Sequence, residues 1–208
     1  MEIEEKLKQK IEEFLGHCCN WENGCSQEFG KLGLSCRKNL SEMEGHPYKY
    51  IECTKFNQGE KVCIGIGFNP AQQFPGKIDR TNKKIIEALN NGKYKTYILL
   101  NLYPLVSSSK TDFDESDENS IAFAKKCLPS LLETIYNDTD ADVLIFWGRT
   151  VSVDCEIFKK IKMFCNPKKQ RLYMTVKKGE SVHCHPAYVP IEIKEVSKEN
   201  LKSSYSVR

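Results

Sequence analysis

Residues 61–70, with the sequence KVCIGIGFNP, constrain the fold of this chain more than any other stretch. A short run of β-branched and small apolar residues that ends in a turn signal is typical of a buried strand in a parallel sheet. Gly67 permits a backbone geometry that a side chain would block, and Pro70 biases Asn69 towards an extended conformation. Asn69 therefore stands at the carboxyl end of a buried strand, where open α/β sheets bind ligands. Taken alone, it is more often the Asn of an ordinary Asn-Pro turn, and the stretches downstream change that balance.

The same pattern recurs further along the chain. Residues 97–104 predict a second buried strand that delivers Asn101 at its end, and residues 142–148 predict a third that stops at a glycine. A fourth strand is expected over residues 171–175 and an edge strand over residues 48–56. Apolar residues at helical spacing predict helices over residues 3–15, around 81–90, and over 118–136 and 151–164. This alternation predicts an α/β fold, a three-layer α/β/α sandwich around a central, mostly parallel four-stranded sheet.

Composition limits the organisation and the partners of the chain. With 208 residues, it is long enough for one sizeable core. We expect an N-terminal helix and Cys-rich, irregular extension over 1–45, the α/β/α domain over 46–193, and a polar, frayed tail over 194–208. A net charge of +3 means that a local patch must meet any anionic partner. No apolar run approaches membrane-spanning length and the N-terminus is charged, so we expect a cytoplasmic, intracellular monomer without membrane association.

Ten cysteines are present, several of them in apparent core segments. Without a signal-like N-terminus, reduced thiols are the simpler interpretation. There is no C-x-x-C pair, and we expect no bound metal and no cofactor. The alternative is a metal site in the N-terminal extension, although its spacings match no standard zinc motif. That site would be built from His17, Cys18, Cys19, Cys25 and Cys36.

Several motifs resemble those of the uracil-DNA glycosylase superfamily. GFNP at 67–70 resembles its first motif, residues 97–104 its second strand, and HPAYV at 185–189 its closing motif. CLPSLL at 127–132 followed by DVLIFWG at 142–148 resembles a helix–strand pair of the iron–sulfur branch. The chain also resembles an uncharacterised bacterial and phage family with Asn-Pro-Ser and His-Pro-Leu-Tyr motifs. Cys127 matches one cluster ligand, but the other cysteines that hold such a cluster are missing, so we expect no iron–sulfur centre.

The resemblance implies a DNA glycosylase that flips a uracil or modified pyrimidine out of single- or double-stranded DNA. Hydrolysis of the N-glycosidic bond would leave an abasic site, in repair or in defence against viruses with modified DNA. Asn69 would position the attacking water through its amide carbonyl, and His185 would donate a hydrogen bond to the departing base. Asp79 would act as a carboxylate near the sugar; an N-cap of the following helix is an equally good interpretation.

The remaining expected site residues bind the base or the DNA backbone. Asn101 would read the base edge, because one amide offers both a donor and an acceptor. Gly67 and Phe68 belong to the first motif, and Phe74 would stack on the flipped base or else anchor its loop in the core. The residues expected to contact DNA are Ser107, Ser108, Arg149, Lys177 and Ser181 at phosphates, with Tyr188 as the wedge.

Two other classes of function stay open on the sequence. One is a hydrolase or transferase that acts on free nucleotides with the same edge of the sheet. The other is a catalytically inactive member that binds DNA or protein. The identity of the base is also open, because Ala71 stands where the related branches have glycine, and Gln72 and Gln73 add polar groups beside it.

Overall fold

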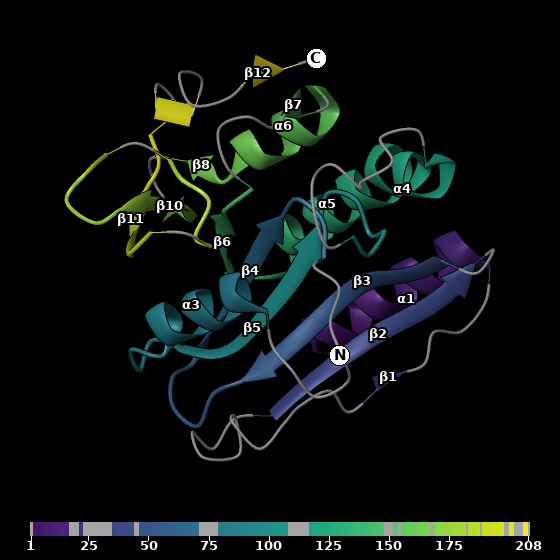
Figure 1. Ribbon diagram of the computed structural model, residues 1–208, viewed down its shortest axis with the longest axis horizontal. Helices are drawn as coiled ribbons and strands as arrows, with labels where there is room; N and C mark the ends of the chain where they lie inside the picture. Colours follow the sequence, from purple (N-terminus) through teal and green to yellow (C-terminus); the bar gives the residue numbers. More distant parts are fainter. Residues whose placement is uncertain are drawn as a thin grey trace.

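The structure is a computed structural model, shown in Figure 1. It describes residues 2–16, 21–22, 35–43, 46–70, 79–107, 117–147, 152–153, 155–166, 169–181, 183–187, 189–197, 200–201 and 206–207.

A mixed sheet of eight strands forms the centre of the fold, in the order β1-β2-β3-β5-β4-β6-β10-β11. Four neighbouring strands, β5, β4, β6 and β10, run parallel. The flanking strands β1, β2 and β3 on one side and β11 on the other are antiparallel to their neighbours. The strands are β1 (Trp21–Glu22), β2 (Ser35–Met43), β3 (His46–Lys55), β4 (Lys61–Gly67), β5 (Tyr94–Asn101), β6 (Asp142–Ile145), β10 (Leu172–Lys177) and β11 (Ile191–Glu195).

The α/β class is therefore confirmed, whereas the predicted sheet of four mostly parallel strands is wrong. The extra strands come from regions with weak local signals. The extension predicted to be irregular contributes β1 and β2, and β3, predicted as an edge strand, lies inside the sheet between β2 and β5. Pairing with partners far along the chain stabilises these strands, and a periodicity within one segment does not reveal such pairing.

Helices cover both faces of the sheet, which gives three layers. They are α1 (Ile3–Leu15), α3 (Arg80–Leu89), α4 (Glu118–Ala122), α5 (Leu128–Asp138) and α6 (Cys155–Met163). A π-helical turn, η1 (Phe123–Cys127), joins α4 to α5, and the Leu128 N–H donates to Phe123 O. Pro129 lies in the first turn of α5 and has no N–H for a bond back to Lys125, which explains the local change of helix type.

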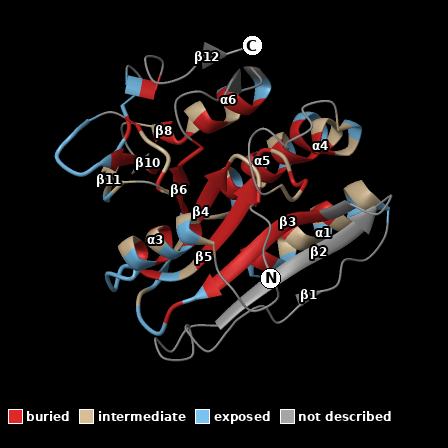
Figure 2. Ribbon diagram, viewed as in Figure 1, coloured by how far each residue is buried: buried red, intermediate tan, exposed pale blue. Residues whose placement is uncertain are grey.

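Alternate residues of each strand serve the two faces. Ile64 and Ile66 of β4 belong to the large core that is covered by α1, η1, α5 and α6. Cys63 belongs to the second core, together with Leu99 of β5 and the buried stripe of α3. Figure 2 shows the central strands buried between these two layers. Val196 and Leu201, which fall within the predicted polar tail, are also buried in the large core.

Short strand pairs complete the described part. β7 (Ser152–Val153) pairs with β12 (Ser206–Val207), and β8 (Cys165–Asn166) with β9 (Lys169–Gln170). Among the described residues, no helix has the length and apolar character needed to cross a membrane.

Candidate functional site

The carboxyl ends of the four parallel strands meet at one edge of the sheet, as predicted for Asn69 and Asn101. Backbone pairing continues for two residues beyond β4 and β5, because the N–H groups of Leu102 and Tyr103 donate to Gly67 O and Phe68 O, each at 2.9 Å. The loops that follow the two strands therefore leave the sheet together. We refer to this region as the carboxyl edge.

Asn69 ties these two loops to each other. Its Nδ2 atom lies 3.4 Å from Ser107 O and 3.4 Å from Pro70 O. The Ser107 N–H donates to Pro70 O at 3.0 Å. With the amide nitrogen used in this way, Oδ1 is the atom left to accept a hydrogen bond, and it receives none from the described residues. The water-positioning role of Asn69 stays a prediction.

Asn101 ends β5 with a side chain that is 3% exposed. Its Nδ2 atom has no hydrogen-bond partner among the described residues. The side chain lies across β4, since a Cβ atom at Gly67 would stand 2.9 Å from Asn101 Oδ1 and 3.1 Å from the Phe146 ring. Gly67 is therefore required by this close approach and not by a left-handed backbone. An unpaired buried donor costs about 1–3 kcal/mol, so packing among the described residues does not explain this atom.

A buried polar cluster that the sequence analysis missed lies on the same face of the sheet. Lys49 Nζ and Glu52 Oε2 of β3 are 2.7 Å apart, and both side chains are almost fully buried. Glu52 Oε1 accepts a hydrogen bond from Asn82 Nδ2 of α3 at 2.6 Å. Because a carboxylate only accepts, this bond fixes the orientation of the Asn82 amide, whose Oδ1 has no partner in the described part of the chain.

The strand register places this cluster near Asn101. Glu52 pairs with Leu99, and Asn101 follows Leu99 by two residues. Glu52 and Asn101 are therefore diagonal neighbours across the two strands, a position in which Cα atoms lie about 7–8 Å apart. A β-bulge between the pairs Asn39–Ile51 and Leu40–Lys49 brings Lys49 to the same face as Glu52. The sequence signal for this cluster was the pair Lys49 and Glu52, two charged residues three apart in a predicted strand. The signal was misleading, because an ideal strand would place these two side chains on opposite faces.

Asp79 is the N-cap of α3. Its Oδ1 atom accepts a hydrogen bond from the Asn82 N–H at 2.7 Å. The carboxylate also faces the positive end of the helix dipole. The structure therefore shows the capping role that the sequence left open beside the catalytic one.

His185 lies on the loop after β10 and is half-buried. Its Nδ1 atom accepts a hydrogen bond from the Ala187 N–H at 3.3 Å, so the neutral ring carries its proton on Nε2. Lys84 of α3 donates to three carbonyls of the same loop, those of Pro186 at 3.0 Å, Ala187 at 3.3 Å and Val189 at 3.1 Å. These bonds dock the loop of His185 on α3, the helix that follows the loop of Asn69.

The other residues predicted to contact the base or the DNA come from several separate segments of the chain. Phe68 is half-buried and packs edge-on against Tyr103, with ring centroids 5.3 Å apart. Lys177 and Ser181 are exposed, but Lys177 Nζ lies 2.5 Å from Glu180 Oε1, a hydrogen bond that raises the pKa of Lys177 and balances its charge. The role of Lys177 as a phosphate contact stays a prediction. Phe74, Ser108, Arg149 and Tyr188 lie outside the described residues.

Within the described residues, no group of three or more His, Cys, Asp or Glu side chains is placed to hold a metal ion. Cys63, Cys127 and Cys184 are free thiols, and burial raises the pKa of Cys127 to about 12. Cys36 lies in β2, where its side chain is not described. The other members of the alternative metal site, His17, Cys18, Cys19 and Cys25, lie outside the described residues.

Residues 50–187 match the profile of a family described as DUF1643, proteins of unknown function. The chain belongs to the DUF1643 family. No curated protein and no solved structure matches it. The matched range of this DUF1643 protein includes Asn69, Asn82, Asn101 and His185, whereas Lys49 lies just before it.

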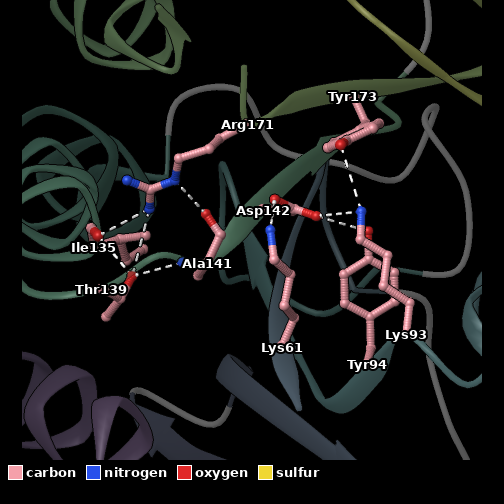
Figure 3. A network of polar contacts seen from close by, with 9 residues as sticks. All are labelled: Lys61, Lys93, Tyr94, Ile135, Thr139, Ala141, Asp142, Arg171 and Tyr173. Carbon is pink, nitrogen blue, oxygen red and sulfur yellow. Dashed lines mark hydrogen bonds and ion pairs between the residues drawn. The ribbon is translucent and has the colours of Figure 1, made fainter. Parts of the chain in front are cut away.

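A second buried polar cluster of this DUF1643 protein lies at the opposite, amino edge of the parallel strands (Figure 3). Asp142, the first residue of β6, is 1% exposed. Its carboxylate lies 2.6 Å from Lys93 Nζ and 3.5 Å from Lys61 Nζ, and accepts from the Tyr94 hydroxyl at 2.9 Å. Burial and the nearby Asp142 carboxylate raise the pKa of the Cys63 thiol, which stays neutral.

Arg171 satisfies backbone carbonyls near the same edge (Figure 3). Its Nε donates to Ala141 O at 2.8 Å, and its guanidinium reaches Ile135 O in the last turn of α5 at 3.3 Å. The guanidinium also stacks on the Phe164 ring, 5.2 Å from its centroid. Arg171 therefore closes the C-terminal end of α5 and joins it to β10.

Proposed function

We propose that this protein is a DNA glycosylase that takes a uracil or modified pyrimidine out of the DNA stack and hydrolyses its N-glycosidic bond. The observation that carries the proposal is the buried Asn101 Nδ2 at the end of β5, which has no partner among the described residues and follows a strand parallel to that of Asn69. The motif resemblance over residues 60–190 supports the same activity.

Two amides of fixed position are available to read the base. Asn101 Nδ2 donates to a ring carbonyl oxygen, and Asn82 Oδ1 accepts from a ring N–H or an exocyclic amine. A pyrimidine edge alternates such groups, so a donor and an acceptor from different elements distinguish one base from another. These hydrogen bonds return part of the few kcal/mol that flipping the base costs.

Asn69 and His185 act on the bond that breaks. Asn69 Oδ1 accepts a hydrogen bond from the attacking water and holds it against the anomeric carbon, without deprotonating it. The bond from that carbon to the base breaks, the base leaves as an anion, and the proton that the water loses as it bonds to the carbon passes to this anion. His185 donates from Nε2 to the oxygen on which negative charge develops as the base departs. A preorganised donor of this kind is worth about 3–4 kcal/mol in the transition state.

A second candidate is a hydrolase that acts on free nucleosides or nucleotides. The ion pair of Lys177 with Glu180 favours it, because it weakens one expected contact to the DNA backbone. The same amides would read a free base equally well. The two candidates therefore differ in whether a strand of nucleic acid is bound.

The test is incubation of the purified protein with single- and double-stranded oligonucleotides that each contain one uracil, thymine or modified pyrimidine. Released bases are identified by mass spectrometry, and abasic sites by alkaline cleavage. The glycosylase releases one class of base and leaves an abasic strand, and the Asn69→Ala variant purified in parallel does not. Release from nucleosides without DNA binding supports the second candidate. Binding of DNA without release of any base identifies an inactive member and overturns the proposal.

A further inference from the structure

The outer surface of α3 forms one side of a shallow groove whose other side is the loop that carries His185. The groove encloses about 430 Å³. It is lined by Arg80, Lys83, Lys84 and Glu87 of α3 and by Ala187 of the loop. Three cationic side chains and one carboxylate give this surface a net positive charge, on a chain whose overall net charge is only +3.

The position of these cations is not explained by the stability of α3. Arg80 is the first residue of the helix, Lys83 follows within one turn, and the first turn contains no acidic residue. The amino end of a helix carries a partial positive charge, so cations there oppose the helix dipole. The Asp79 carboxylate already caps this helix end, so the anion that these cations suit is one that lies along the outer surface of the helix.

Two of the three cations, Arg80 and Lys84, can be compared with the ion pairs of the described residues. Neither Arg80 nor Lys84 forms an ion pair with any residue that the structure describes, in contrast to Lys177 with Glu180. Lys84 uses its donors on three neutral carbonyls of the opposite loop. These bonds hold the half-buried Lys84 ammonium beside the loop, whereas Arg80 and Lys83 are exposed.

We propose that this groove binds the phosphate backbone of DNA next to the flipped nucleotide, an inference that rests on the proposed glycosylase function. The groove is formed by segments that adjoin candidate site residues, because Ala187 follows His185 by two residues and Arg80 follows the N-cap Asp79 directly. Phosphodiesters passing along α3 would meet Arg80 and Lys83 while the target base enters the carboxyl edge. A strand of DNA is the occupant, because a row of separate cations along a helix matches a row of phosphates.

The test is the salt dependence of DNA binding, measured by filter binding for wild type and for the double variant Arg80→Gln/Lys83→Gln. Loss of two phosphate contacts should lower the slope of log K against log salt by about 1.8 for duplex and about 1.4 for single strands. The matched control is Lys125→Gln/Lys126→Gln, which removes two exposed lysines of η1 on the opposite face of the sheet and should leave the slope unchanged. Glu87→Gln, which removes the carboxylate of the groove, should tighten binding.

The outcomes separate this inference from the proposed function. Base release by wild type is measured on the same DNA. If wild type binds with the expected slope change in the variant but releases no base, the glycosylase proposal fails and the groove remains a DNA-binding surface. An unchanged slope in Arg80→Gln/Lys83→Gln, an equal loss in the control, or no DNA binding by wild type overturns the inference. Displacement of DNA by inorganic phosphate at constant ionic strength, in wild type but not in the double variant, identifies a small-anion site and also overturns it.

Discussion

The two ends of the same parallel strands carry buried polar clusters that differ in how completely their atoms are paired. At the amino edge, the Asp142 carboxylate is matched by two lysines and a tyrosine hydroxyl. At the carboxyl edge, Asn101 and Asn82 each keep one buried amide atom without a partner in the described chain. The fold itself accounts for the paired cluster. The unpaired atoms lower stability, and the proposed function accounts for them as groups that bind a ligand.

The largest expected effect is on chemistry at the carboxyl edge. Asn69→Ala and His185→Ala should each reduce the single-turnover rate of base release about 100-fold or more, because both side chains act mainly in the transition state. DNA binding, measured by filter binding on the same DNA, should remain nearly unchanged. If both variants release the base as fast as wild type, Asn69 and His185 only form turns. The carboxyl edge would then have no function assigned to it.

The next effect is on stability at the amino edge. Asp142→Ala should lower the free energy of unfolding by about 1.5–3 kcal/mol, the range for hydrogen bonds to a charged group. The effect should not exceed this range, since Lys61 and Lys93 are partly exposed and their charges can be hydrated. Urea unfolding gives the stability, and the rate of base release by the folded protein should equal that of wild type. A variant of normal stability that has lost base release would place function at the amino edge instead.

Asn101→Ala should act on base choice more than on stability. The base edge loses its partner, worth about 1–3 kcal/mol, so the preference for the correct base should fall about tenfold in competition assays. Unfolding should change little, because removing the unpaired Nδ2 donor offsets the packing lost with the buried side chain. The matched control is Thr54→Val, which removes another buried unpartnered atom, in β3 opposite Tyr97 and further from the carboxyl edge. If the control relaxes base choice equally, unpaired atoms do not distinguish the two regions.

No effect at all is expected from removal of metal. The carboxyl edge is proposed to act through amide and imidazole groups, so dialysis against EDTA should leave the rate of base release unchanged. Elemental analysis should find no stoichiometric iron, and the protein should be colourless, because the cysteines that would complete an iron–sulfur cluster beside Cys127 are missing. Stoichiometric zinc would instead support the alternative site around His17 and Cys18.

Local sequence pattern determined the elements that deliver the candidate site. The run of β-branched residues that ends in GFNP predicted β4 at its observed bounds, Lys61–Gly67, and the second run predicted that β5 ends at Asn101. The helix predicted over residues 3–15 is α1. These features depend on side-chain periodicity and on turn residues within a few positions, so the sequence of one segment contains them. The shared edge for Asn69 and Asn101 then followed from the parallel arrangement of their strands.

Only the tertiary structure decided which polar side chains face that edge and how they are held. Lys49 and Glu52 share a face because of a β-bulge, and their partner Asn82 is supplied by a helix 30 residues away from Glu52 along the chain. Asp79 was open between two roles until its bond to the Asn82 N–H placed it as a cap. Each of these results depends on register and on contacts between distant segments. The free energy of such contacts is not expressed in the pattern of either segment alone.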